Sequence, residues 1–149
     1  MQIASVAYAL GFGCIGGEML DTSYLKYYLH LLGITPNSNG YHYFVDALSM
    51  AEEDPWKLTL ITKLIYPEIA KNHKTSISAV EKSLRSVKNH MWETDKCLVC
   101  KICQMNFSQR PTVSTLLACL TTSPYIFPQK YNVIGVKISK DTSDNVNGE

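Results

Sequence analysis

The chain has 149 residues, a formal net charge of +1 and an apolar content of 46%, which suits one domain, or one domain with a tail. No stretch approaches the roughly 18 uninterrupted apolar residues that a membrane-spanning helix needs. The first 17 residues are uncharged, so they lack the Lys or Arg that begins a secretory signal, and the same absence argues against a lipoprotein anchor at Cys14. We therefore expect a cytoplasmic protein without membrane contact, with an N-terminal extension over residues 1–20.

Three helices are predicted in the first part of the chain. The first begins after the capping residues at 21–23 and stops at Gly33. A loop over residues 34–39 leads to a second helix from about Gly40 to Asp54, and a third covers residues 56–65. Their inward-facing residues are Leu25, Tyr28, Leu29 and Leu32, then Tyr43, Phe44, Ala47, Leu48 and Ala51, then Leu58, Ile61, Leu64 and Ile65.

A short helix and a longer one follow, separated by a few polar residues. Pro67 suits the first turn of the short helix, over residues 67–72, and Ser76 can cap the longer helix, which ends near Trp92. The longer helix carries one apolar stripe, with Ile69 and the small Ala70 of the short helix facing it. The stripe consists of Ile77, Val80, Leu84, Val87 and Met91. This pattern is typical of a helix-turn-helix, whose second helix enters a DNA major groove; an ordinary packed helix pair is the alternative.

The outer face of the longer helix is basic and rich in hydrogen-bonding groups. Arg85 and Lys82 can donate to guanine or to phosphate, and Glu81 can accept from the cytosine amino group. Ser76, Ser78 and Lys88 are better placed for phosphates, which position a protein without reading sequence. Residues 57–110 contain ten Lys and Arg against four Asp and Glu, a net charge of +6, while the rest of the chain carries −5. This asymmetry favours a nucleic-acid binder over a merely solvated basic face.

The C-terminal third is predicted to hold one more helix and a tail. Pro111 and Thr112 open a helix carrying Val113, Leu116, Leu117 and Leu120. Residues 125–138 are rich in aromatic and β-branched residues and could pair as a strand or two, and residues 139–149 are polar and expected to be disordered. We therefore expect an all-α, six-helix domain over residues 21–122 that contains the helix-turn-helix, followed by a non-helical tail over residues 123–149.

Cys97, Cys100 and Cys103 have the spacing of metal-binding thiolates. Three thiolates at this spacing could serve an iron–sulfur cluster, or a zinc site that His90 completes. A fourth thiolate is not near in sequence, and the same spacing places the three on one side of a short helix, where cysteines pack as small hydrophobes. We expect packed, reduced thiols and no metal.

Catalytic patterns are absent from the sequence. Neither a phosphate-cradling glycine loop nor an arrangement of nucleophile, base and carboxylate can be argued from the spacing. We therefore expect that the chain is not an enzyme and binds no cofactor.

Three stretches of residues carry a family resemblance. Residues 40–43 (GYHY), 61–71 (ITKLIYPEIAK) and 80–85 (VEKSLR), with a weaker match at 110–112 (RPT), resemble the C-terminal DNA-binding domain of the sporulation master response regulator family, stage zero sporulation protein A. The resemblance covers roughly residues 21–122, and the middle stretch is its most specific part. It implies a bacterial, helical, metal-free effector domain that binds double-stranded DNA, with pairing of domains on tandem DNA sites.

The chain departs from that family at several positions. The family's recognition helix carries Arg where this chain has Ala79 and Lys82, and His where it has Ser86, whereas Glu81 and Arg85 match. Ala79 lacks a bidentate donor, and Lys82 is not equivalent to Arg, so we expect either a different DNA specificity or a lower DNA affinity than in the family. The family's regulators also place a phosphoacceptor receiver domain ahead of this one, and here only about 20 residues precede the first helix. We expect a sequence-specific, DNA-binding transcription regulator without a receiver domain. The alternative is an interaction module that does not bind DNA and engages the full-length regulator or RNA polymerase.

Overall fold

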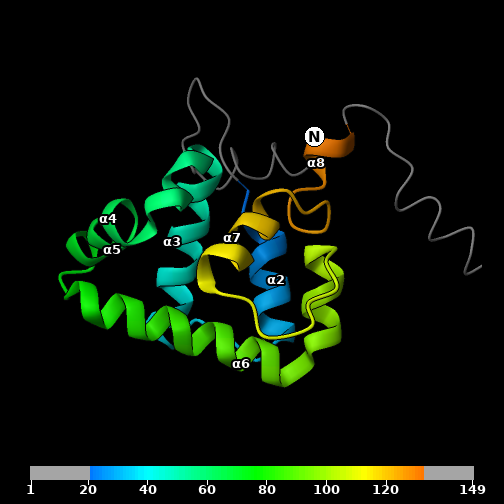
Figure 1. The fold of residues 1–149 in the computed structure, drawn as a ribbon, viewed down its shortest axis with the longest axis horizontal. Helices are drawn as coiled ribbons and strands as arrows, with labels where there is room; N and C mark the ends of the chain where they lie inside the picture. The colour runs from blue at the N-terminus through cyan, green and yellow to red at the C-terminus, as the bar shows by residue number, and fades with distance from the viewer. Residues whose placement is uncertain (1–20, 133–149) are drawn as a thin grey trace, which may run out of the picture.

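The computed structural model describes residues 21–132, and every regular element in this range is helical (Figure 1). In chain order the elements are α2 (Ser23–Leu31), α3 (Asn39–Glu53), the 3₁₀ helix η1 (Pro55–Leu60), α4 (Ile61–Leu64), α5 (Tyr66–Asn72), α6 (Ile77–Cys103), α7 (Val113–Thr121) and α8 (Gln129–Asn132). The predicted all-α class is confirmed, and a helix is found in each of the six segments predicted within residues 21–122.

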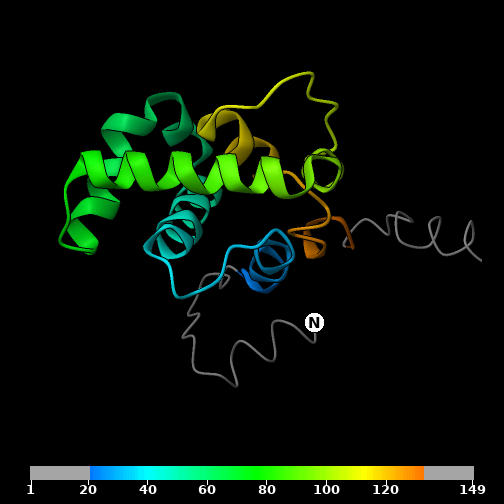
Figure 2. The ribbon, with the colours of Figure 1, turned by 90° about the horizontal axis from the view of Figure 1, so that it is seen from below.

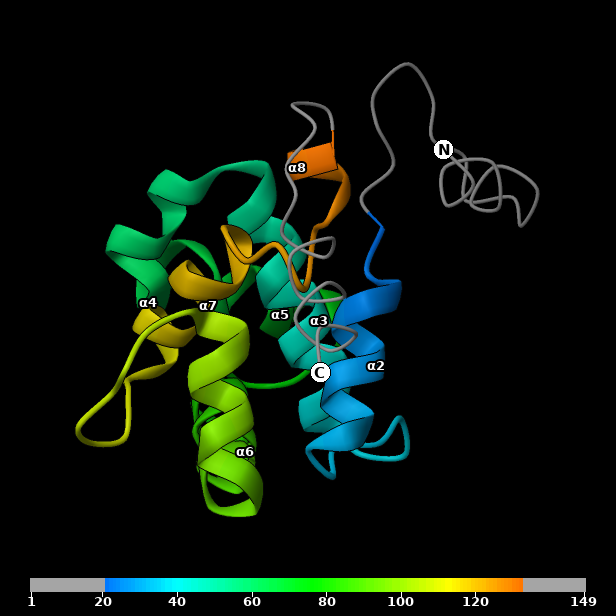
Figure 3. The same cartoon turned by 90° about the vertical axis from the view of Figure 1, so that its right-hand side faces the viewer.

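Helix α3 lies at the centre of the molecule. It packs against α2, η1, α5, α6 and α7, and α6 crosses it in Figure 2. Figure 3 shows α2 beside α3 on the side away from α7. The largest fully buried side chains include Leu25, Leu29, Leu32, Phe44, Leu48, Ile65, Ile69, Leu84, Met91, Ile102, Leu116 and Phe127. These residues come from all the longer helices, so a single apolar core holds the fold together.

Hydroxyl caps define where the main helices begin. The hydroxyl oxygen of Ser38 accepts a hydrogen bond from the Tyr41 amide at 3.2 Å at the start of α3. Ser76 does the same for the Ala79 amide at 3.1 Å at the start of α6. Each bond satisfies an amide that the helix itself leaves without a partner. The predicted cap at Ser76 is therefore confirmed.

Gly40 sets the separation of α3 and α6. A Cβ at this position would lie 2.5 Å from Val87 Cγ2 and 3.4 Å from the Ser83 carbonyl oxygen. Only a residue without a side chain allows the first turn of α3 to approach the middle of α6 this closely.

Two predicted helices differ from the structure. The third predicted helix is two pieces, η1 and the four-residue α4, separated by the non-helical backbone of Leu60 at φ −133° and ψ 53°. The break predicted near Trp92 is found at Asp95, and α6 continues beyond it to Cys103. It kinks at Asp95, where φ is −161° and ψ is 84°, and Figure 1 shows the chain changing direction there. The Asp95 carboxylate accepts from the Leu98 amide at 3.0 Å, which starts a new helical turn at once.

The core extends past residue 122, where we had placed the end of the helical region. Ile126 and Phe127 are fully buried, and the Lys130 ammonium donates to Glu52 at 2.6 Å and to the Thr121 carbonyl at 2.8 Å. The described part of the predicted strand segment contains a helical turn, α8, instead of a strand. Residues 1–20 and 133–149, including Cys14 and the segment expected to be disordered, lie outside the described residues. Within residues 21–132, no helix is both long and apolar enough to cross a membrane.

Candidate nucleic-acid interface

The helix-turn-helix consists of α5, a tight turn and the first part of α6. The Thr75 amide donates to the Ala70 carbonyl at 2.9 Å, and Lys74 adopts a left-handed conformation with φ 54°. Ile69, Ala70 and Val80 are buried, as the sequence predicted, so α5 packs closely on the first turns of α6. The direction of α6 is therefore fixed by both the turn and the core.

A polar contact ties the turn to the central helix. His73 Nε2 lies 2.6 Å from the Asp46 carboxylate of α3, and the His73 ring packs edge-on against Tyr43 with the ring centroids 5.0 Å apart. These contacts join residues that lie 27 positions apart in the sequence. The spacing of apolar residues gave no sign of them, because they depend on how α3 and the turn meet in space.

The predicted DNA-contacting residues share the outer face of the first part of α6. Ser76, Ser78, Lys82 and Arg85 are exposed, whereas Glu81 and Lys88 are half-buried. On the opposite face, Val80, Leu84, Val87 and Met91 are buried. Helical periodicity alone therefore separated the two faces from Val80 onward.

Ile77 does not belong to the buried stripe of α6, although its spacing predicts that it does. Its side chain is 45% exposed, because it is the first residue of α6 and projects beyond the elements that cover the rest of the stripe. An exposed apolar side chain at the start of this helix is available for contact with a thymine methyl group. Nothing in the sequence marked this exposure, since an Ile at helical spacing is usually a core residue.

Glu81 and Arg85 form an ion pair along the outer face. Arg85 donates to the Glu81 carboxylate at 2.9 Å, one helical turn away. Both side chains are about half exposed, 53% for Arg85 and 47% for Glu81, and such pairs stabilise a helix by only about 0.3–0.5 kcal/mol. Burial raises the pKa of Tyr66, the Glu81 carboxylate raises it further and the Arg85 guanidinium lowers it. The phenol of α5 therefore lies within the field of this pair.

A group of cations gathers around Lys88. Burial lowers the pKa of Lys88, and the charges of Arg110 and Arg85 lower it further. Arg110 reaches Glu93 at 3.2 Å, whereas neither Lys82 nor Lys88 has an ion-pair partner among the described residues. Positive charges that lack acidic partners within the protein favour an external anion such as phosphate.

The three closely spaced cysteines lie on α6 beyond its kink. Cys97 is exposed, Cys100 half-buried and Cys103 buried, and burial, followed by the neighbouring Cys119 and Cys100, raises the pKa of the Cys103 thiol. The raised pKa keeps Cys103 in the protonated form that packs as a small apolar group. His90, which we considered as a zinc ligand, lies against Gly33. Among residues 21–132, no three His, Cys, Asp or Glu side chains are arranged to hold a metal.

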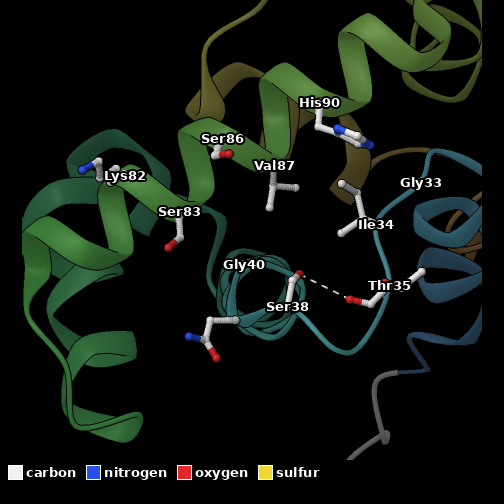
Figure 4. Close-up of a pocket in the computed structure, with 11 residues that line it drawn as sticks. Gly33, Ile34, Thr35, Ser38, Gly40, Lys82, Ser83, Ser86, Val87 and His90 are labelled. Atoms are coloured by element: carbon white, nitrogen blue, oxygen red, sulfur yellow. Dashed lines mark hydrogen bonds between the residues drawn. The ribbon is translucent and has the colours of Figure 1, made fainter.

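A groove beside α6 was not predicted from the sequence. It runs between α6 and the segment that joins α2 to α3, and its volume is about 570 Å³ (Figure 4). The sequence signals were Gly33, with φ 85°, and Gly40, the two small residues that bring this segment close to α6. Their consequence became visible only once the segment and α6 were placed side by side.

One family comparison bears on this face of the molecule. The family described as sporulation initiation factor Spo0A C terminal matches residues 25–123. The matched range runs from α2 to just beyond α7, so it contains the helix-turn-helix and the helices that support it. The chain therefore belongs to the Spo0A C-terminal family, and its helical core is a DNA-binding effector domain of the sporulation-regulator type.

Proposed function

We propose that the chain is a sequence-specific transcription regulator that inserts the first turns of α6 into the major groove of double-stranded DNA. The observation that carries the proposal is the cationic outer face of α6, which the tight turn and the core hold in one orientation. The family supports DNA binding as such; the reading of particular bases is our proposal.

The residues of this face divide into two roles. Arg85 contacts a base edge as a donor, Lys82 donates to a base edge or to a phosphate, and Glu81 accepts from a cytosine amino group. Ser76, Ser78 and Lys88 contact phosphates and set the register of the helix in the groove. To contact a base, Arg85 must break its ion pair with Glu81 or donate to both groups at once. Because that exposed pair contributes little free energy, breaking it costs little.

Selection from a random duplex library, followed by gel shifts at about 50 and 200 mM salt, tests the proposal. A sequence-specific regulator should enrich one motif and bind it at least about a thousandfold more tightly than unrelated duplex. Binding to all duplexes alike, with a steep salt dependence, would leave only non-specific phosphate contact and would refute base reading.

One residue favours a second candidate function. Ala79, near the start of α6, is half-buried and offers no donor where the resembled recognition helix carries Arg. A module that engages the full-length regulator or RNA polymerase would tolerate that loss. If the chain binds no duplex at low salt but forms a complex with the purified full-length regulator or with purified RNA polymerase, this candidate replaces the first.

Pairing on DNA is a separate part of the proposal. We infer that two copies occupy tandem sites, in keeping with the resemblance to the sporulation regulators. Duplexes carrying one or two copies of the enriched motif should then differ, with two copies giving a cooperative second shift. Equal and independent occupancy of both copies would show that the copies do not interact.

A further inference from the structure

The groove beside α6 has two walls of different origin. One wall comes from α6, and the other comes from the segment between α2 and α3 together with the first turn of α3 (Figure 4). The α6 wall consists of Lys82, Ser83, Ser86, Val87 and His90. The opposite wall consists of Gly33, Ile34, Thr35, Ser38, Asn39 and Gly40.

The chemistry of the lining fits a polar, anionic occupant. None of the lining residues is acidic, and Lys82, which has no ion-pair partner within the described chain, supplies a positive charge. Five further lining residues carry hydroxyl or amide groups: Thr35, Ser38, Asn39, Ser83 and Ser86. The apolar members Ile34 and Val87 are each only 6% exposed, so an apolar helix or peptide would find little surface to cover.

The groove is continuous with the proposed DNA-reading face. Lys82 belongs to both, and Ser86 and His90 follow it along α6 at one-turn intervals, as Figure 4 shows. A major groove is about 12 Å wide and admits one helix, so the backbones of the two strands run along the sides of that helix. The α2–α3 segment stands beside α6 at the place where one such backbone would pass.

We propose that the sugar–phosphate backbone of one DNA strand lies in this groove, between Lys82 of α6 and Ser38 and Asn39 of the opposite wall. This inference rests on the proposed function, since it assumes that α6 enters the major groove. The α2–α3 segment then acts as a second, sequence-independent contact that fixes the rotation of α6 about its own axis. Phosphate contacts of this kind position a protein and strengthen binding to all sequences alike.

Two substitutions of Ser38 test the groove without disturbing the helix cap. Asp and Asn both cap helices as well as Ser does, so Ser38→Asp and Ser38→Asn should each preserve α3, and thermal unfolding of the full chain verifies this. Ser38→Asp adds a negative charge beside the phosphates and should weaken duplex binding about fivefold to tenfold at 0.1 M salt, on specific and non-specific duplexes alike. Ser38→Asn keeps the cap without adding charge, so its binding should be clearly tighter than that of Ser38→Asp on the same duplexes.

A substitution of Asn39 provides the opposite change. Asn39 is exposed at the start of α3, so Asn39→Lys should add one phosphate contact, tighten binding about threefold and steepen the salt slope by about one unit. Asn39→Gln keeps the amide and adds no charge, so it should not steepen the salt slope. Ser38→Asp could also weaken binding by attracting Lys82 away from DNA. Tighter binding by Asn39→Lys would exclude that explanation, because a Lys at position 39 does not attract Lys82.

The outcomes separate this inference from the one on which it rests. If the unmodified chain binds duplex and Arg85→Ala weakens that binding, but the Ser38 and Asn39 variants behave like their controls, the groove does not contact DNA and this inference is wrong. If the unmodified chain binds no duplex at low salt, the proposed function fails and the inference fails with it.

Discussion

Glu81 is the residue whose substitution best distinguishes base reading from charge attraction. Its carboxylate repels phosphate, so a helix that bound DNA by charge alone would gain affinity for every duplex from Glu81→Ala. If Glu81 accepts from a cytosine, Glu81→Ala should weaken the enriched motif by about 1–3 kcal/mol and leave unrelated duplex unchanged or bound more tightly. Titrations on both duplexes measure the difference.

Arg85→Ala is the matched variant, because it removes the other half of the same ion pair. It should cost about 1–3 kcal/mol on the enriched motif and flatten the preference at one base pair. The free energy of unfolding should change by only about 0.5 kcal/mol in either variant. Uniformly tighter binding after Glu81→Ala would mean that α6 does not read bases through this residue.

Substitution of Gly40 is expected to change the stability of the fold. Gly40→Ala places a methyl group 2.5 Å from Val87 Cγ2, and Val has little rotamer freedom with which to move aside. The free energy of unfolding should fall by about 1–3 kcal/mol, in spite of the better helix propensity of Ala. Urea denaturation checks this, with the exposed neighbour Asn39→Ala as the control, which should lose only a few tenths of a kcal/mol. Equal stability of both variants would show that α3 and α6 can separate without cost.

At the scale of single elements, the start of α6 depends on one hydroxyl. Ser76→Ala removes the bond to the Ala79 amide and should lower the free energy of unfolding by about 1 kcal/mol. Ser78→Ala is the control, since Ser78 lies inside α6, is exposed and is not the capping residue. Both can be measured by urea denaturation. A larger loss in Ser78→Ala than in Ser76→Ala would contradict the assignment of the cap.

Some of the helices and contacts could be predicted from sequence patterns, and others could not. The helix-turn-helix and the buried stripe of α6 from Val80 onward were predicted correctly, because periodicity and capping are local properties of the chain. The end predicted near Trp92 lies close to the break at Asp95, whose side chain caps the helical stretch that follows. The groove and the His73–Asp46 contact could not be predicted, since both depend on segments far apart in sequence meeting in space.

For the whole molecule, the structure places part of the predicted tail inside the core. Phe127→Ala should lower the free energy of unfolding by about 3–5 kcal/mol, because Phe127 is fully buried. Trp56→Ala is the control: Trp56 is also aromatic but is 63% exposed, and its loss should change stability by only about 0.5 kcal/mol. Thermal unfolding compares the two. A stable Phe127→Ala variant would mean that the residues after α7 are dispensable for folding.

The central position of α3 has a consequence for how the domain opens. Its first turn contacts α6, and its Asp46 contacts His73 in the turn before α6. Its Glu52 accepts a hydrogen bond from Lys130, close to the C-terminal end of the described residues. Detachment of α2, η1, α5, α6 or α7 would each uncover part of α3. Partial opening at any of these helices therefore exposes core surface that is otherwise exposed only on complete unfolding. In native-state hydrogen exchange, the slowest amides of α3, α6 and α7 should then report one common opening free energy, as in a single cooperative unit.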